Sequence, residues 1–504
     1  MRRALLVGLL CCLGLATGLY LMSQNYIFKD KSRPFDVFLY KKAAPDTDSF
    51  ESDVEGYCQL LRLPALAVGV ARGDSLVFFK GVGTMGSPKD EPITADHAFP
   101  VAEVAETFTA IVLKQMEKEG KLSLEDPLSR YPNRFFNEAR WDEETTLGHL
   151  VSHTSESVPH GSQFVYNDSK FNLVLNVFIG ADKTVAEEIQ RRILMPLNMD
   201  HTLLSYDERK HGYEMQSSVN DLVRYSVALG QNALLSATSY EQLTNPFYPG
   251  SPYGSGWFTT RFEGTVLHWS FGYDNNDAAL LLRIPSSDLT FIMLVPGSVP
   301  PDLTRLGYGN PFNSMLVCSF FRNFVQTKND RSRLFVEERF TEAMTMSLLP
   351  DSLHSSPAKG EKLLLELMDE FPADTIWQTP AAFERVAASE NQRVLQVGLK
   401  MADGYFRKKK LHPVKAWYAG LIYQKSGKLE EAMTCYESLA WGDQYKEQPF
   451  KFDAMVQVAK EHSFAAPRHS REILQDLVRF KEYISVNDQQ YKEVKRVLIQ
   501  LKNK

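Results

Sequence analysis

The chain has 504 residues, a formal net charge of −6, and 44% apolar and 23% charged residues. This length predicts two to four domains at about 100–200 residues each, and the composition is that of a folded globular protein rather than a disordered one. The weak acidity argues against a general nucleic-acid binder, which needs a basic face. The five cysteines form no C-x-x-C pair, so neither a zinc knuckle nor a thioredoxin-type motif is predicted.

The first 23 residues carry a location signal. Arg2 and Arg3 precede an uncharged stretch over 4–22, which is about the length that spans a bilayer as a helix. Because a positive flank is typical of a cytoplasmic N-terminus, we expect residues 1–23 to be a membrane anchor and the main domains to lie outside the cytoplasm, in the periplasm or the extracellular space. The alternative is a signal peptide cleaved near Ala16, which would give a secreted protein. Residues 24–49 are polar and are expected to form a linker.

Residues 50–326 mix strand and helix patterns. Apolar runs at 65–71 and 75–81, separated by an Arg-Gly-Asp turn, predict a hairpin. Apolar residues at helical spacing predict a helix over 105–119, and further helices are expected near 146–152, 172–179, 185–193 and 220–229. Strand-like runs return at 278–284 and 290–295. Strands, then helices, then strands again predict one sheet with a helical insertion.

From residue 331 to 504 helical periodicity predominates, which predicts an all-α domain. One segment resembles a single tetratricopeptide repeat, a pair of antiparallel helices, through the spacing of Ala416, Gly420, Tyr423, Gly427, Ala432 and Tyr436. Further helices are expected at 391–406, 452–461, 470–483 and 488–501. A plain helical bundle is the alternative, because only one copy is visible and solenoids need about three. In either form the region is a candidate surface for a protein partner.

Six segments between residues 63 and 297 resemble, in chain order, the serine β-lactamase and penicillin-binding-protein family, particularly its class C and esterase-like branch. They are PALAVGVARGDSLVFFKGVG at 64–83, FPVAEVAETFTA at 99–110, EGKLSLEDPLSRY at 119–131, TLGHLVSHTS at 146–155, ILMPLNM at 193–199 and YGSGW at 253–257. The resemblance implies an α/β (α+β) fold of the β-lactamase/transpeptidase type over residues 50–326. In that fold an antiparallel sheet is flanked by helices and carries a helical subdomain.

The first catalytic element of the family is a serine followed one turn later by a lysine, at the start of a helix. The matching residues here are Glu103 and Glu106. Glutamate is a poor nucleophile toward amides, and Glu106 replaces a positive charge with a negative one. Repulsion between two carboxylates one turn apart predicts a raised pKa for one of them and rejection of anionic penicillins or peptide stems. The alternatives are a new acid/base pair and ordinary first-turn carboxylates favoured by the helix dipole.

The second element, Tyr-x-Asn, matches Tyr166 and Asp168. The resemblance implies that Tyr166 corresponds to the general-base tyrosine. Asp168 stands where an asparagine would hydrogen-bond a substrate amide, and an ionised aspartate cannot donate a hydrogen bond. Substrate positioning is therefore in doubt, and a packed aromatic role for Tyr166 is the alternative.

The third element, Lys/His-Thr/Ser-Gly on the strand that lines the cleft, is assigned to His268, Trp269 and Ser270. The histidine agrees with this branch of the family and the other two residues do not. A side chain at Ser270 in place of glycine would crowd the strand edge. If Trp269 filled the cleft, the domain would be purely structural.

His149 and His153 lie four residues apart and could form a metal pair. They coincide with histidines that are structural in the family, so hydrogen-bonding roles are expected, and neither a metal nor a cofactor is predicted.

These departures predict a catalytically inactive pseudoenzyme that is membrane-tethered and serves as a binding or scaffold module, with a small-molecule or peptide ligand in the cleft. A divergent hydrolase acting on an ester, an amide or a D-amino-acid peptide through Tyr166 and His268 is one alternative. A protein-interaction adaptor that works through the helical tail, with a merely structural front domain, is the other. No nucleic-acid partner is expected.

Overall fold

The structure is a computed structural model that describes residues 44–84, 91–132, 144–157, 159–178, 183–207, 212–274, 276–326, 332–349, 357–406, 412–441, 450–462 and 496. The predicted anchor (1–23), most of the predicted linker, the helix expected at 470–483 and, apart from residue 496, the helix expected at 488–501 lie outside these residues. No helix within the described part of the chain is long and apolar enough to cross a membrane. Three of the cysteines, Cys58, Cys318 and Cys435, are buried free thiols.

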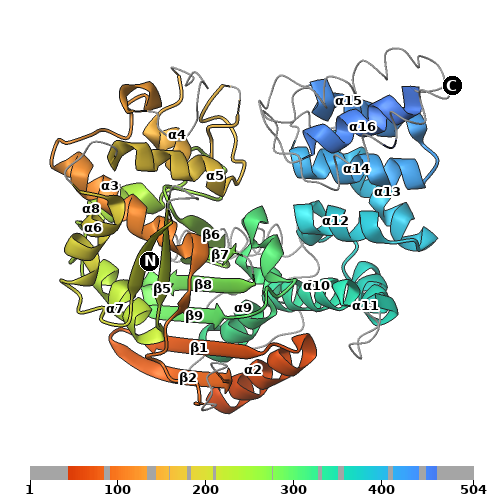
Figure 1. Ribbon diagram of the computed structural model, residues 1–504. Helices are drawn as coiled ribbons and strands as arrows, with labels where there is room; N and C mark the ends of the chain where they lie inside the picture. Colours follow the sequence, from red (N-terminus) through yellow and green to blue (C-terminus); the bar gives the residue numbers. More distant parts are fainter. Residues whose placement is uncertain are drawn as a thin grey trace, which may run out of the picture.

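An antiparallel sheet forms the centre of the first domain (Figure 1), with the strand order β2-β1-β9-β8-β7-β6. The strands are β1 (Ala65–Arg72), β2 (Ser75–Gly83), β6 (Phe258–Phe262), β7 (Thr265–Asp274), β8 (Asp277–Ile284) and β9 (Leu289–Val295). The predicted hairpin is β1 and β2, and the two late strand-like runs are β8 and β9. The N-terminal hairpin therefore joins the C-terminal strands through the β1–β9 pairing, which closes one sheet around the helical insertion.

Helices cover both faces of this sheet. On one face lie α2 (Thr47–Leu61), which begins within the last residues of the predicted linker, and α9 (Met315–Phe320) followed by a wider turn, η8 (Phe321–Val325). On the other face lie α3 (Ala105–Lys118) and α7 (Val219–Gly230), close to the positions expected for the helices at 105–119 and 220–229. Successive residues of each strand point to opposite faces of the sheet, so the sheet separates two apolar cores.

The insertion between β2 and β6 carries the remaining short elements. A small sheet is made by β3 (Phe99–Pro100), β4 (Leu203–Asp207) and β5 (Gly212–Ser217). The helices and turns are η1 (Ala102–Val104), η2 (Leu128–Arg130), α4 (Leu147–Val151), α5 (Asp168–Phe171), η3 (Asn172–Phe178), α6 (Val185–Ile189), η4 (Gln190–Leu194) and α8 (Ala237–Thr244). After β8 and β9 come η5 (Pro285–Ser287), η6 (Leu303–Tyr308) and η7 (Pro311–Asn313).

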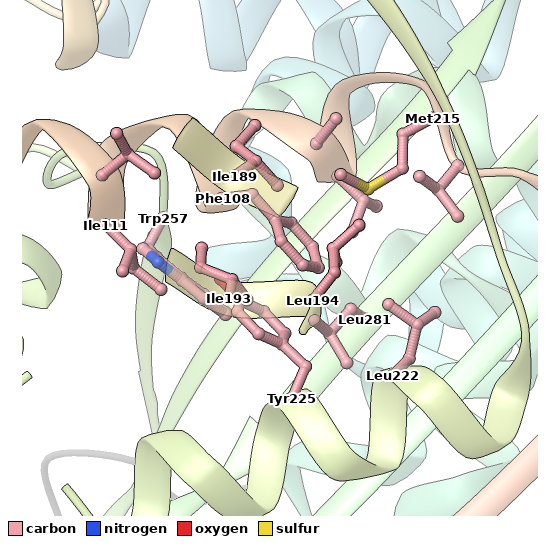
Figure 2. Packing of buried hydrophobic residues seen from close by; sticks show 14 of the residues in the cluster. Phe108, Ile111, Ile189, Ile193, Leu194, Met215, Leu222, Tyr225, Trp257 and Leu281 are labelled. Atoms are coloured by element: carbon pink, nitrogen blue, oxygen red, sulfur yellow. The ribbon is translucent and has the colours of Figure 1, made fainter. Parts of the chain in front are cut away.

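Packing of large side chains holds α3 against α7 and the sheet (Figure 2). The rings of Phe108 and Tyr225 stack with centroids 4.0 Å apart, and Trp257 lies beside Tyr225. The hydroxyl of Tyr225 also donates to Thr107 Oγ1 at 3.1 Å. Complete burial of a side chain such as Phe108 contributes about 1.5–3 kcal/mol. This anchoring matters for the site because α3 and the turn before it carry Glu103 and Glu106.

The second domain is helical, as expected, and forms its own apolar core. Its elements are α10 (Arg333–Leu348), α11 (Pro357–Glu370), η10 (Thr375–Gln378), α12 (Pro380–Ala388), α13 (Gln392–Phe406), α14 (Pro413–Lys425), α15 (Leu429–Trp441) and α16 (Lys451–His462). Glycine at 420 lets α14 and α15 cross closely, since a Cβ there would lie 2.5 Å from the ring of Tyr436. The assignment of this pair to a tetratricopeptide repeat stays a prediction. The two domains meet where Glu384 of α12 accepts hydrogen bonds from Arg305 (2.7 Å) and Tyr308 (2.9 Å) of η6.

Candidate functional site

The turn that precedes α3 presents Glu103 at the edge of the sheet. Ala102, two residues after β3, has a φ of 45°, in the left-handed region that a residue with a Cβ rarely adopts. Backbone of this kind costs about 1–3 kcal/mol and is found preferentially at functional sites. Glu103 follows on η1, and Glu106 lies in the first turn of α3. The two residues predicted from the sequence to replace the nucleophile and the lysine thus occupy one strained helix start.

Strand β7 lies against this turn at Gly272. A Cβ on Gly272 would lie 2.3 Å from the backbone nitrogen of Glu103 and 2.9 Å from the Cβ of Ala102, so only glycine fits. The next residue, Tyr273, donates its backbone N–H to Glu103 Oε2 at 2.8 Å. The assignment of Ser270 to the position of the strand glycine is therefore wrong by two residues: the triplet at this point of the strand is Ser270-Phe271-Gly272.

His268 is not part of this cluster. Its Nδ1 lies 3.0 Å from the hydroxyl of Tyr240, which also accepts a hydrogen bond from Arg283 at 2.7 Å. Burial and the nearby charges of Arg283 and Arg261 lower the pKa of His268 to about 4, so the ring is neutral at physiological pH. The motif match predicted that His268 belongs to the site. The residues of β7 that lie against Glu103 are instead Gly272 and Tyr273, four and five positions further along the strand.

Trp269 does not fill the cleft. Strand residues alternate between the two faces, and Trp269 belongs to the apolar core on the side of α2 and α9. There its ring stacks on Phe258 with centroids 4.2 Å apart, and its Nε1–H donates to Thr260 Oγ1 at 3.0 Å.

Burial controls the protonation of both glutamates. It raises the pKa of Glu103 from 4.5 to about 8, with further increases from the charges of Glu106 and Asp168; its own backbone N–H and that of Tyr273 oppose the rise. Glu106 is only 6% exposed, and burial, together with the charge of Asp168, holds its pKa well above 4.5. The sequence predicts a raised pKa for one of the two through their mutual repulsion; in the structure burial is the larger cause for both, and the charge of Glu106 adds to the rise at Glu103.

Partners of Glu106 come from two segments. Tyr253 donates its hydroxyl to Glu106 Oε2 at 3.2 Å, and His153 Nε2 lies 3.5 Å from the same oxygen. Glu106 Oε1 and His153 Nε2 are buried and have no hydrogen-bond partner among the described residues. Burial lowers the pKa of His153 to about 4, so it does not supply the positive charge that the missing lysine would bring.

Tyr166 and Asp168 are brought to the same cluster, as the sequence predicts. The ring of Tyr166 packs on His153 (4.4 Å between centroids), Phe271 (5.6 Å) and Phe258 (5.9 Å). Burial raises its pKa well above 10, and the charges of Glu106 and Glu103 raise it further. A tyrosine in these surroundings holds its proton firmly and is unsuited to act as a general base. Asp168 begins α5 and is exposed.

The structure describes no group of three or more His, Cys, Asp or Glu side chains arranged to hold a metal ion within the ranges given above. His149 Nδ1 accepts from the backbone N–H of Thr146, and His153 Nδ1 lies 3.1 Å from the backbone of Asn167. Both histidines therefore have the hydrogen-bonding roles expected from the sequence.

Three residues of the cluster were not singled out from the sequence: Tyr253, Gly272 and Tyr273. Tyr253 begins the matched YGSGW segment, and Gly272 is the one glycine of β7, so weak signals existed for both. Nothing in the sequence indicates that Tyr273, 41% exposed, would supply a backbone donor.

Comparison with known proteins gives a family match for the first domain. A family model described as Beta-lactamase matches residues 51–309. Protein flp from Staphylococcus aureus (strain MW2) is 22% identical over 312 residues, which cover 48% of this chain and 61% of that protein, so the chain spans about three fifths of the length of the curated relatives it matches.

Similar solved structures include the octameric penicillin-binding protein homologue from Pyrococcus abyssi, at 18% identity and a TM-score of 0.49 over 60% of this chain and 82% of that one. D-amino acid amidase from Ochrobactrum anthropi SV3, complexed with L-phenylalanine amide, matches at 15% identity and a TM-score of 0.41 over 49% and 92%. The family match over residues 51–309 spans half of the chain, and this protein therefore belongs to the beta-lactamase family.

Proposed function

We propose that the beta-lactamase-type domain binds a ligand in the cleft at Glu103 and does not form an acyl-enzyme. The observation that carries this proposal is the position of the Glu103 carboxyl on the backbone N–H of Tyr273. Convergent backbone N–H groups are the usual means of stabilising the oxyanion of acyl transfer. In this protein the backbone N–H groups of Tyr273 and Glu103 bind the Glu103 side chain, which stands in place of the nucleophile. An acyl group on that carboxylate would be a reactive anhydride.

Two features support binding over a purely structural role. Ala102, next to Glu103, holds a strained φ of 45°, and strain of this kind persists where a site needs it. Glu103 is partly exposed, and Asp168 and Tyr273 are exposed, so a ligand can approach the carboxyl groups of Glu103 and Asp168.

The test is covalent labelling of the full chain with a fluorescent penicillin and with a fluorophosphonate, followed by intact-mass analysis. We expect no adduct under conditions that label a serine-containing member of the family in parallel. A stable adduct of one label per chain would overturn the proposal.

Hydrolysis by an activated water is a second candidate, favoured by the pKa of about 8 for Glu103, which suits a general acid or base near neutral pH. Tyr166 would then be a packing and positioning residue, and His268 would take no part. Turnover of D-amino-acid amides and of aryl esters measures this activity. Hydrolysis abolished by Glu103→Gln, but retained in the surface variant Glu125→Gln, would establish it.

For the remainder of the chain we propose attachment to a membrane through residues 1–23, with the main domains outside the cytoplasm, and a protein partner bound by residues 331–504. Alkaline extraction of membranes, with and without residues 1–23, tests the anchor. Pull-down with and without residues 331–504 tests the partner surface; capture of the same proteins after the truncation would count against it.

A further inference from the structure

A cavity of about 310 Å³ lies in the helical domain, bordered by η10, α12, α13 and the start of α14. It is separate from the cleft at Glu103, because every residue that lines it falls between 372 and 415. Its volume is at the lower end of the range of about 300–1,000 Å³ in which proteins hold small molecules. Several of its lining residues are exposed, among them Lys400 and Gly404, so a ligand can enter from solvent.

Aromatic rings form part of the cavity wall, and their polar atoms are already bound. Trp377 of η10 is buried and donates its Nε1–H to the carbonyl oxygen of Phe371 at 2.8 Å. Tyr405 lies edge-on to Phe383, with ring centroids 5.8 Å apart. Its hydroxyl donates to the carbonyl oxygen of His412 at 3.1 Å and accepts from the backbone N–H of the same residue. These rings therefore offer apolar surface, which favours an aromatic or apolar body on the ligand.

Two lysines give the cavity positive charge. Lys400 of α13 is exposed and forms no ion pair with any residue that the structure describes. Lys415 is half-buried in the first turn of α14, where the helix dipole already favours an anion, and the N-cap residue His412 makes no side-chain hydrogen bond to that turn. Asp374 also lines the cavity, but its carboxyl group is bound by Arg333. The charge left for a ligand to meet is therefore positive.

Gly404 leaves one part of the cavity wall without a side chain, and packing does not require a glycine there. At the other three glycines within the described helices of this domain, Gly360, Gly398 and Gly420, a Cβ would lie 2.3–2.5 Å from a neighbouring side chain. At Gly404 nothing lies within 4 Å of the Cβ position. A side chain at this position would lie on the same helix face as Val397, which lines the cavity. Because glycine weakens a helix relative to alanine, the open space beside it is the feature that accounts for it.

We propose that this cavity binds a small organic anion with an aromatic or branched apolar body. The body would lie against Trp377 and Tyr405, in the space beside Gly404, and the anionic group would pair with Lys400 and Lys415. Lysine ammonium groups donate to carboxylate and phosphate oxygens alike, so the two kinds of headgroup share this chemistry. The site is independent of the ligand proposed for the cleft at Glu103.

The experiment is isothermal titration calorimetry on the full chain with probes that share a phenyl ring and differ in charge. The probes are 3-phenylpropionate, phenyl phosphate, 3-phenylpropanol and 3-phenylpropylammonium, and acetate measures the effect of charge without the ring. We expect at least one of the two phenyl anions to bind at least about tenfold more tightly than the alcohol, the amine or acetate. The tighter of the two anions identifies the headgroup as a carboxylate or a phosphate.

Two variants locate the binding. Lys400→Met removes the charge and keeps a long side chain, so it should weaken the anion about tenfold and leave the alcohol unchanged. Gly404→Leu should weaken each phenyl probe that binds by at least about tenfold, with a Tm that is unchanged or higher, since leucine favours a helix more than glycine does. The matched controls are Lys362→Met on α11, whose side chain is 78% exposed, and Gly56→Leu in α2, where nothing lies within 4 Å of the Cβ position. Neither control should change the affinity.

Failure of both phenyl anions to bind at up to about 10 mM overturns the inference, since a weaker affinity would not be specific. So does equal or tighter binding of the alcohol, the amine or acetate, or unchanged affinity in either cavity variant. Thermal melting checks that each variant folds; if leucine at position 404 lowers the Tm, the probe series and Lys400→Met decide the outcome. Weaker anion binding in both cavity variants, with both controls unchanged, establishes the site.

Discussion

Replacing Glu103 by glutamine should make the protein more stable at alkaline pH and leave it almost unchanged at acidic pH. In the unfolded chain the Glu103 carboxyl loses its proton near pH 4.5, whereas in the folded protein burial keeps the proton until about pH 8. Folding therefore binds a proton between these two values, and stability falls as the pH rises through that window. Glutamine keeps the size of the side chain and an oxygen that can accept from Tyr273, but it has no proton to lose.

The magnitude follows from the difference between the two pKa values. From 4.5 to about 8, at about 1.4 kcal/mol per pH unit, the full cost of ionising Glu103 in the folded protein is about 5 kcal/mol. Because the side chain is partly exposed, solvent screening reduces this cost, and we expect about 2–4 kcal/mol at pH 8.5. For a domain of this size that corresponds to a rise in Tm of about 4–8 °C.

Differential scanning calorimetry of the wild type and Glu103→Gln between pH 5 and 8.5 is the assay. Their Tm values should coincide near pH 5 and diverge steadily up to about pH 8. Glu119→Gln is the contrasting control: hydrogen bonds from Arg192 and Lys121 lower the pKa of Glu119 to about 2, so its loss should lower Tm by the same amount across the whole range. Parallel Tm curves for wild type and Glu103→Gln would refute the assignment of a buried, proton-holding carboxyl.

Three other predictions follow from the packing and the site. Phe108→Ala should cost about 3–5 kcal/mol of unfolding free energy, seen as a lower Tm, because the ring is fully buried against α7; a loss below about 1 kcal/mol would mean that α3 is not held there. The double substitution Glu103→Ser with Glu106→Lys should not restore labelling by fluorescent penicillin, since Asp168 still lacks the donor that a substrate amide requires, and labelling would contradict this. His268→Ala should leave the Tm difference between wild type and Glu103→Gln at pH 8.5 unchanged within about 1 °C, because distant sites contribute additively; a changed difference would place His268 beside Glu103.

Much of the domain could be predicted from local sequence. The hairpin, the helix over 105–119 and the last two strands appear close to their expected bounds, because alternation and helical spacing of apolar residues record which face each element buries. The placement of Glu103, Glu106, Tyr166 and Asp168 in one cleft was also predicted, through a resemblance spread over six segments.

Other features depend on contacts between distant parts of the chain. Which residue of β7 lies against Glu103 depends on how β7 pairs with β8, and a strand's register cannot be read from a short motif with two altered positions. His268 and Ser270 were therefore assigned two residues too early, and Gly272 was missed. Tyr253 meets Glu106 across 147 residues of sequence.

The sequence by itself determined that this protein carries two carboxyl groups where its family places a serine and a lysine, because identity and spacing along one helix are local properties. Only the tertiary structure decided what those groups do. The close approach of β7 at Gly272 puts the Glu103 carboxyl on a backbone donor, and the surrounding aromatic side chains exclude the water that would otherwise keep both glutamates ionised. Burial and hydrogen bonding are properties of the assembled cleft, so the chemistry of the site is not contained in any one segment.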